Sequence, residues 1–547
     1  MRKVIAVREL PVGIQTFSEI IKGGYVYADK TGYIADLAAR GKYFFLSRPR
    51  RFGKSLFVDT LNEAFAGNRD LFTGLALAGS DFDFTPSPVV RLDFSRFSVA
   101  TPGDLTLGLT VTLSRIAGEY QIELPVTNPS LMLDDLILAL ARTRGARVVV
   151  LIDEYDKPII DHLTDPVTAE ANRDLLRSVF GVLKALDAHL RFVFLTGVSK
   201  FSRTSLFSQL NNLTDISLRK PYVNICGISE AEFDLLFAEH LTKVAGAWHQ
   251  QGLAAGDPVS LRKLLFTWYD GYSWDGQSRV FNPFSLLSFF ASGEVYPYWY
   301  TSGIPRFLID RMVGQPVLYA QIQDAEITEV DLDSHDVVNA SLPSLLFQTG
   351  FLTVKSVDES QWPRLYRLGF PNVEVSTSFA RNFLMDLAGE RQSEASSWSA
   401  RMRRSLNNGQ LDLLQDCLTG LFATIPYNLH QPQESFYHAI FLAVTQFLGF
   451  QIAGEVAVAG GEIDGTIDTL TGKSYVIEMK YAKTAPDAAD AVVDQILATA
   501  ADHALAQIEA KRYADKYAGT GLDVYKVAIA VTGRGRVHTA WAHQNHH

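Results

Sequence analysis

The stretch "SRPRRFGKSLFVDTL", residues 47–61, predicts a phosphate-binding turn that joins a strand to a helix. The apolar run "GKYFFLS" leads into this turn, and apolar residues at helical spacing follow it from Lys54 onward. In such a turn the backbone N–H groups around Gly53 surround phosphate oxygens at the helix N-terminus, and Lys54 neutralises their charge. The Ser55 hydroxyl can ligate Mg²⁺. The stretch therefore predicts a nucleotide site.

The turn departs from the usual pattern G-x-x-x-x-G-K-[ST] at its first position. Arg48 stands where that pattern has its first glycine, and Pro49 removes one backbone N–H donor. Arg50 and Arg51 add positive charge in partial exchange for these losses. On these residues alone, a basic turn that only caps a helix is the alternative interpretation.

Three segments further along the chain indicate a parallel sheet. "SPVVRLDFS", "ARVVVLIDEYDKP" and "LRFVFLTGVSKFS" have the composition of strands, and helical stretches such as "NRDLLRSVFGVLKALDAH" lie between them. Strands that alternate with helices and are apolar along their length are typical of a parallel sheet covered on both faces. Ligands of such sheets bind at the carboxyl ends of the strands, where we expect Lys54, Asp153 and Thr196 to converge.

Two adjacent carboxylates end the second of these strands. Asp153 can hold Mg²⁺, commonly through water, and Glu154 can polarise the water that attacks a γ-phosphate. A helix-capping pair is the alternative, but the phosphate-binding turn upstream favours the magnesium and hydrolysis roles. Thr196 can sense the γ-phosphate or simply bond to the backbone. Arg203 can reach a γ-phosphate in its own or a neighbouring subunit, or it can lie exposed in solvent.

Composition excludes several classes of protein. The chain has 547 residues, 47% of them hydrophobic, which is enough for two to four domains with their own cores. A formal net charge of −10 excludes a polybasic nucleic-acid coat, so any nucleic-acid contact needs a local basic surface. Two isolated cysteines favour a reducing, cytoplasmic setting. No apolar run of membrane-spanning length occurs, so we expect no membrane partner.

The middle of the chain, residues 216–420, carries no second nucleotide motif. Its aromatic stretches "WYDGYSW" and "VFNPFSLLSFF" could stack on bases, but packing in the core of a helical lid is the favoured interpretation. Residues 341–387 then follow the order helix, strand, turn, strand, helix. That order suits a winged-helix-like module, with either a binding or a packing role.

A second set of chemical residues lies in "GEVAVAGGEIDGTIDTLTGKSYVIEMKYAK", residues 454–483. Two strand-type runs flank a turn at Thr471-Gly472-Lys473, so a β-hairpin can bring Asp464 close to Glu478. Glu478 and Lys480 are two positions apart and share one face of the strand. The two carboxylates can ligate Mg²⁺ for phosphodiester hydrolysis, while Lys480 orients the attacking water or stabilises charge. The alternative is an exposed strand face that alternates Glu and Lys as ion pairs.

Four blocks of sequence resemble a known family. "YVYADKTGYIADL", "SRPRRFGKSL", "LIDEYDKPI" and "TGVSKFS" look like the signature blocks of the bacterial AAA-ATPase-like family whose members carry a C-terminal nuclease-like domain. The resemblance runs from about Val12 to Tyr513, and it implies a P-loop fold and ATP. In that family the arginine-rich loop is the usual form.

The last region resembles the PD-(D/E)XK nuclease fold. A helix precedes the strands that carry Asp and then Glu-x-Lys, and a second helix follows them. This resemblance implies metal and catalytic roles for Asp464, Glu478 and Lys480. It also implies accessory positions at Glu434 and Gln507, for which a capping carboxylate and a solvated glutamine are the alternatives. Where many members have Gly-Arg before the aspartate, this chain has Glu462, which removes a phosphate contact or adds a metal ligand.

The sequence thus predicts an α/β protein with three regions. We expect an AAA-like P-loop ATPase domain over residues 1–215, a helical lid and winged-helix-like region over 216–420, and a PD-(D/E)XK nuclease-like α/β domain over 421–547. The expected function is an ATP-binding switch or ATPase coupled to a Mg²⁺-dependent nuclease, with DNA as the favoured substrate. A nucleotide-regulated binding or scaffold protein with degenerate sites is the alternative. The expected cofactors are ATP and Mg²⁺, and a protein partner or a second copy of the chain is a further expectation.

Overall fold

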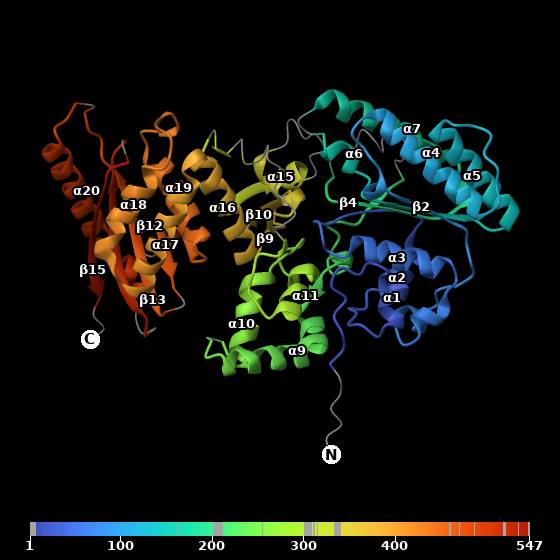
Figure 1. The fold of residues 1–547 in the computed structure, drawn as a ribbon, viewed down its shortest axis with the longest axis horizontal. Helices are drawn as coiled ribbons and strands as arrows, with labels where there is room; N and C mark the ends of the chain where they lie inside the picture. Colours follow the sequence, from blue (N-terminus) through green and yellow to red (C-terminus); the bar gives the residue numbers. More distant parts are fainter. Residues whose placement is uncertain are drawn as a thin grey trace, which may run out of the picture. The chain divides into compact units, whose positions relative to one another are not determined.

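A computed structural model describes most of the chain (Figure 1). The described residues are 7–162, 165–200, 212–253, 255–299, 315–332, 341–360, 362–458, 461–469, 471–485, 487–517, 521–533 and 535–544, with Ile309, Met312 and Val313; for residues 451–463 the description covers the backbone. The chain forms two compact units. Unit 1 comprises Met1–Trp299 and Glu326–Asn372, and unit 2 comprises Tyr300–Ala325 and Val373–His547.

Unit 1 contains the predicted parallel sheet. Its five strands have the order β2-β3-β4-β1-β5, and every neighbouring pair is parallel. The strands are β1 (Tyr43–Ser47), β2 (Val89–Asp93), β3 (Val148–Asp153), β4 (Leu190–Gly197) and β5 (Thr214–Asp215). Because β4 lies between β1 and β3, the turn after β1 and the carboxylates after β3 end at the same edge of the sheet.

Helices cover both faces of this sheet (Figure 1). One face carries α1 (Phe17–Lys22), α2 (Gly32–Arg40) and α3 (Lys54–Phe65), and the other carries α4 (Pro102–Glu119), α5 (Pro129–Arg144) and α7 (Pro166–Ala185); the short α6 (Lys157–Ile160) follows β3. Each of α4, α5 and α7 begins with a capping Thr, Asn or Asp followed by proline. This combination pairs free N–H groups and sets the first helical φ, so it starts a helix at that residue.

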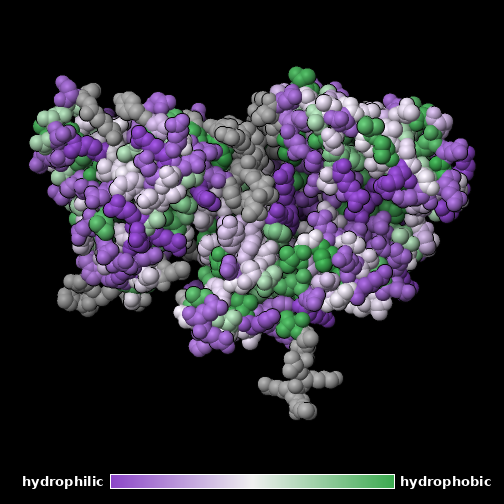
Figure 2. Space-filling view, in the orientation of Figure 1, coloured by the Kyte–Doolittle hydropathy of each residue, from purple (hydrophilic) through white to green (hydrophobic). Residues whose placement is uncertain are grey.

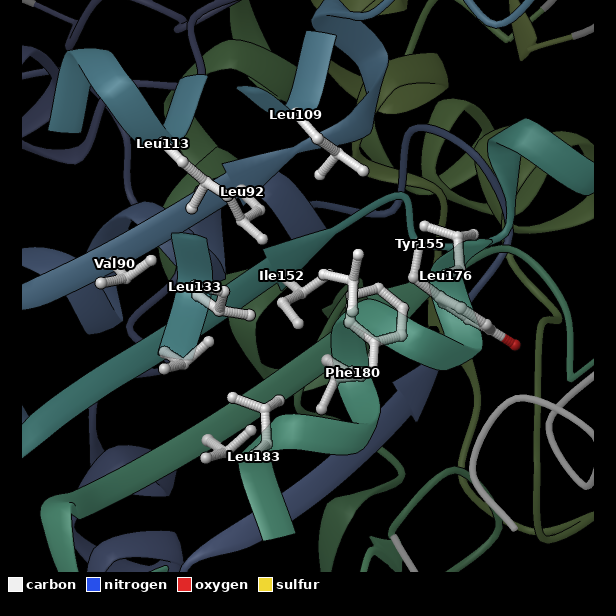
Figure 3. Close-up of a cluster of buried hydrophobic side chains, with 14 of the residues drawn as sticks. Val90, Leu92, Leu109, Leu113, Leu133, Ile152, Tyr155, Leu176, Phe180 and Leu183 are labelled. Atoms are coloured by element: carbon white, nitrogen blue, oxygen red, sulfur yellow. The ribbon is translucent and has the colours of Figure 1, made fainter. Parts of the chain in front are cut away.

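Alternating side chains of the strands build two cores. Toward α4, α5 and α7, aliphatic residues such as Leu92, Ile152 and Leu113 form a continuous buried cluster (Figure 3). Toward α3, phenylalanines pack ring to ring, with centroids 5.6 Å apart for Phe57 and Phe194. Burial on both faces explains why β3 is an unbroken apolar run instead of an alternating one.

The helical middle of unit 1 consists of α9 (Glu230–Gln250), α10 (Pro258–Tyr269) and α11 (Pro283–Ser292), with the short strands β6 (Ile228–Ser229) and β7 (Val280–Phe281). Most of its aromatic residues are buried or partly buried and contact each other; Phe233 and Phe281 stack with centroids 5.1 Å apart. The prediction of core packing for the aromatic stretches is therefore confirmed. Asn282 caps α11 by accepting from the N–H groups of Phe284 and Ser285.

The predicted order helix, strand, strand, helix is also confirmed, as α15 (Leu342–Thr349), β9 (Thr353–Asp358), β10 (Leu365–Gly369) and α16 (Val373–Ala388). β8 (Ala325–Thr328) joins β10 and β9 in a three-stranded sheet, and α14 (Glu329–Leu332) follows it. The stretch does not form a unit of its own, because α16 belongs to unit 2.

Unit 2 contains a mixed sheet with the sequential order β11-β12-β13-β14-β15. Its strands are β11 (Gln451–Val458), β12 (Gly461–Asp468), β13 (Lys473–Tyr481), β14 (Asp523–Val531) and β15 (Val537–Gln544), and its helices are α13 (Val317–Gln321), α16, α17 (Gln392–Asn408), α18 (Leu414–Phe422), α19 (Glu434–Phe447) and α20 (Asp490–Ala510). Among the described strands of this sheet, only β13 and β14 pair in parallel. Small side chains, including Ala501, Ala504 and Ala528, let α20 pack closely on the sheet.

The surface is mainly hydrophilic, as expected when the hydrophobic side chains pack in internal cores. Hydrophilic side chains occupy most of the face seen in Figure 2, and hydrophobic ones form small groups between them. In the part of the chain that the structure describes, no helix combines the length and apolar character needed to span a bilayer.

Candidate functional site

The turn between β1 and α3 brings the predicted phosphate ligands to the helix N-terminus. Gly53 is the N-cap of α3 with φ 94°, a left-handed conformation that glycine adopts without strain. Lys54, the first helical residue, is 5% exposed, and its ammonium donates to the Pro49 carbonyl at 3.1 Å. A phosphate that entered the turn could replace this carbonyl as the partner of Lys54.

The carboxylates after β3 lie against the same turn. Asp153 is 1% exposed, and burial raises its pKa, while a hydrogen bond with Ser55 and the charge of Lys54 oppose the rise. The Glu154 N–H donates to Asp153 Oδ1 at 3.0 Å, and Glu154 itself has φ 51°, so the chain turns sharply at this residue. Burial also raises the pKa of Glu154, and Lys54 again opposes it. The structure therefore brings Lys54, Ser55, Asp153 and Glu154 together.

Thr196 ends β4 between these two groups. Its hydroxyl donates to the Leu46 carbonyl of β1 at 2.8 Å, and the residue is fully buried. This contact is the backbone-bonding alternative considered for Thr196. Arg203 lies outside the described residues.

The structure explains the arginine that replaces the first glycine of the pattern. Arg48 points into the protein and is 1% exposed. Its guanidinium donates to the carbonyls of Ser47, Ser217 and Tyr222 at 2.8, 2.9 and 3.1 Å, and it lies 3.8 Å from the ring centre of Trp274. Burial lowers the pKa of Arg48 to about 10, still well above neutral pH. Arg48 is thus a structural cation that fastens the turn to the helical middle.

The other two arginines of the turn have different surroundings. Arg51 has φ 65°; its guanidinium donates to the Tyr298 carbonyl at 3.2 Å and lies 4.0 Å from the ring centre of Phe284. Arg51 therefore contacts the helical middle instead of facing Lys54. Arg50 is exposed, its charge favours the ionised form of Glu154, and its carbonyl accepts from the Trp299 indole at 3.0 Å.

Two features of this site were not predicted. Asp156 is fully buried and accepts hydrogen bonds from the Ser199 N–H at 2.7 Å and the Ser199 hydroxyl at 2.8 Å, so it holds the segment after β4. The second aspartate of "DEYD" was the available signal. In addition, an apolar cavity adjoins Gly53. It is lined by residues of four segments that include Val26, Tyr27, Leu56, Cys226, Ile228 and Leu287. No local pattern marks this cavity, because the four segments are separate in sequence.

The second candidate site lies on the hairpin of β12 and β13 in unit 2. The antiparallel register pairs Gly465 with Ile477, so Asp464 faces Glu478 one position further along. Asp464 Oδ2 accepts the Met479 N–H at 2.6 Å. His438 of α19 binds the Asp464 carbonyl oxygen at 2.7 Å, which fixes the backbone at this residue from the helix side.

Glu478 is the most enclosed acid of this site. Its Oε1 accepts from Lys480 at 2.9 Å and from the Gln507 amide, and its side chain is 3% exposed. Its Oε2 is buried and has no hydrogen-bond partner among the described residues. Burial raises the pKa of Glu478, Lys480 opposes the rise, and Asp464 adds to it.

Glu434, at the start of α19, also reaches this site. Its Oε2 accepts the Tyr481 N–H at 2.9 Å, and its Oε1 lies 3.8 Å from the Lys480 ammonium. The structure thus brings Glu434, Asp464, Glu478, Lys480 and Gln507 together, whereas the side chain of Glu462 lies outside the description.

This donor set suits a hard divalent cation. The described residues contain no group of three or more His, Cys, Asp or Glu arranged as a ready ligand set. Mg²⁺ does not require one, since it keeps several waters and takes one or two carboxylates from the protein. The free, buried Oε2 of Glu478 next to Asp464 fits that mode of binding.

Comparisons with known proteins match two regions of the chain. Residues 11–207 match the family described as "Predicted AAA-ATPase", and residues 432–541 match the PD-(D/E)XK nuclease superfamily. A protein of Azotobacter chroococcum mcd 1, described as "Uncharacterized protein in vnfD 5'region", is 36% identical over 528 residues, which cover 95% of this chain and 96% of that protein. The chain therefore belongs to the AAA-ATPase-like family and carries a C-terminal domain of the PD-(D/E)XK nuclease superfamily.

Proposed function

We propose that the chain is an ATP-controlled, Mg²⁺-dependent nuclease that cleaves phosphodiester bonds of DNA. The observation that carries the proposal is the buried, unpartnered Oε2 of Glu478, which lies beside Asp464 and Lys480 in a domain of a nuclease superfamily. Leaving a carboxylate oxygen buried without a partner is costly unless a bound group takes it up.

At the nucleotide site each residue has a distinct task. Lys54 would exchange its contact with the Pro49 carbonyl for phosphate oxygens, and the free backbone N–H groups at the start of α3 would donate to the same phosphate. Ser55 and Asp153 would hold the Mg²⁺ of the nucleotide, and Glu154 orients the attacking water. The apolar cavity beside Gly53 has the lining that a nucleobase needs.

At the nuclease site Asp464 and Glu478 would hold Mg²⁺. A bound Mg²⁺ supplies an activated water and neutralises charge on the phosphate. Gln507 and Lys480 fix one oxygen of Glu478 and leave the other, Oε2, available to a metal ion, and Glu434 holds the strand backbone at Tyr481. The Lys480 ammonium remains near the reacting phosphate, where it offsets developing negative charge.

A cleavage assay tests the nuclease proposal. Full-length protein is incubated with plasmid, linear and single-stranded DNA and with RNA, in Mg²⁺ or Mn²⁺, with and without ATP. Asp464→Ala, Glu478→Ala and Lys480→Ala should each reduce cleavage at least about 100-fold. Glu509→Gln, an exposed acid on α20, is the control and should cleave normally. Wild-type protein that cleaves while the Asp464 and Glu478 variants cleave equally well would rule out this site.

Binding of a fluorescent ATP analogue tests the nucleotide site. Lys54→Ala should lose binding, because the turn loses its phosphate counter-charge, and Glu154→Gln should bind the analogue but hydrolyse ATP slowly. Lys42→Ala removes a cation that pairs with Asp187 and should bind like wild type. Equal affinity of wild type and Lys54→Ala would refute the nucleotide assignment.

The same proposal covers location and partners. Both cysteines, Cys226 and Cys417, are free and buried, which fits a reducing, cytoplasmic setting. A second copy of the chain or a protein partner would supply contacts at the ATP site from outside. Size-exclusion chromatography with light scattering, with and without ATP, tests this part.

A further inference from the structure

A basic edge lies beside the nuclease carboxylates. Gln507 of α20 binds Glu478, and Lys511 follows one helical turn later at the C-cap of the same helix. Residues four apart on a helix share one side, so Lys511 lies on the side of α20 that faces Glu478. Lys511 is exposed, and its charge acts on both Glu478 and Lys480.

A second lysine approaches the same strand face from the turn after α20. Tyr513 and Tyr517 are buried and anchor the short helix η11 (Tyr513–Tyr517) to the sheet. Lys516, between them, is exposed, and its ammonium donates to the Thr466 hydroxyl at 3.1 Å. Thr466 lies two positions after Asp464 on β12, so both side chains share one face of that strand. Lys516 therefore lies along the strand from the candidate metal position.

These two lysines differ from the basic residues around them. Among the described residues neither forms an ion pair with a carboxylate, whereas Arg512 pairs with Asp515 at 2.7 Å and Lys526 pairs with Glu509 at 2.8 Å. The Lys480 charge acts on Lys511, and Lys516 lies further along the same strand face, where Asp468 is the charged group that acts on it. A nucleic-acid strand has regularly spaced phosphates, so it can contact exposed ammonium groups at successive positions along this face.

We propose that Lys511 and Lys516 bind the backbone phosphates that neighbour the scissile phosphate, so that the substrate strand passes over the C-terminal end of α20. This inference rests on the proposed nuclease function and adds the path of the substrate. The two residues are binding groups: they hold the strand and leave the chemical step to Asp464, Glu478 and Lys480.

Binding measurements on the full chain test the path. Fluorescence anisotropy with labelled single- and double-stranded DNA is recorded between about 50 and 300 mM KCl, in an Asp464→Asn background that prevents cleavage. Lys511→Gln and Lys516→Gln should each weaken binding several-fold and lower the slope of log Kd against log salt by about 1. Lys511→Arg should restore both. The matched controls Arg512→Gln and Lys526→Gln, whose cations are paired, should leave affinity and slope unchanged.

Cleavage kinetics then separate binding from chemistry. In otherwise wild-type protein, Lys511→Gln and Lys516→Gln should raise KM several-fold and leave kcat within about twofold. If wild type cleaves through Asp464 while both lysine variants bind and cleave like the controls, the path is wrong and the nuclease proposal stands. If wild type neither binds nor cleaves any nucleic acid, both proposals fall.

Discussion

Replacing Arg48 by glycine restores the usual phosphate-loop pattern, yet we expect it to damage the protein. Arg48→Gly removes the guanidinium that bonds to the carbonyls of Ser47, Ser217 and Tyr222 and that stacks on Trp274. The carbonyls of Ser217 and Tyr222 lose a buried donor, and a cavity opens beneath the turn. The consequence is a looser phosphate loop in a less stable unit 1.

The size of the effect follows from opposing contributions. Burial lowers the pKa of Arg48 from its usual range to about 10, which at 1.36 kcal/mol per pKa unit opposes the charged folded form by roughly 3 kcal/mol. Against this, a hydrogen bond from a charged donor contributes about 1.5–3 kcal/mol and a desolvated cation–π contact about 2 kcal/mol. Three bonds and one such contact exceed the cost of burial. We expect Arg48→Gly to destabilise unit 1 by about 3–5 kcal/mol.

Urea denaturation, followed by hydrogen-exchange mass spectrometry of peptides from β1 and α3, measures this quantity in unit 1 itself. Arg50→Ala is the matched control, because Arg50 is exposed in the same turn and should change stability by no more than about 0.5 kcal/mol. The ATP analogue should bind Arg48→Gly more weakly than wild type. Unchanged unfolding together with tighter nucleotide binding would refute the structural role of Arg48.

Three further predictions concern buried acids and the metal. Burial raises the pKa of Asp270 to about 6, so its contribution to folding is present below about pH 4 and is lost as the pH rises through 6. Asp270→Asn should therefore be more stable than wild type by about 3 kcal/mol at pH 7 and equal to it near pH 4. Urea titrations at both pH values measure the difference. Asp156→Ala should cost about 1–3 kcal/mol, because the Ser199 N–H loses its buried acceptor; thermal unfolding measures it, and an unchanged midpoint would contradict the anchoring role. Mg²⁺ at about 100 times its Kd should stabilise unit 2 by about 2.7 kcal/mol, EDTA should reverse this, and Glu478→Gln should show no response in the same scan.

The elements around the nucleotide site were predictable because each has a local signal. Each signal consists of a few consecutive residues: the apolar run of β3, the Gly-Lys-Ser turn and the two adjacent acids. Asp156 was missed because its partner Ser199 lies 43 positions away, on a different strand end. The apolar cavity was missed for the same reason, since its walls come from four separate segments.

In unit 2 the pairing of Asp464 with Glu478 was predictable from the hairpin spacing, and the register agrees with it. The roles of neighbouring groups were not predictable. His438 binds a backbone carbonyl of β12, and Lys516 binds Thr466 across 50 positions. Such contacts depend on how α19 and α20 pack on the sheet, and helical periodicity alone does not specify that packing.

The sequence by itself determined the alternation of strands and helices, the positions of both chemical clusters and their order in the chain, because hydrophobic period and turn chemistry act over short distances. Only the tertiary structure decided the direction in which the arginine side chains of the turn between β1 and α3 point. Arg48 turns inward to carbonyls 169 and 174 positions away, and Arg51 reaches a carbonyl 247 positions away. A long cationic side chain has several rotamers of similar energy, so the groups that happen to fold against it select one.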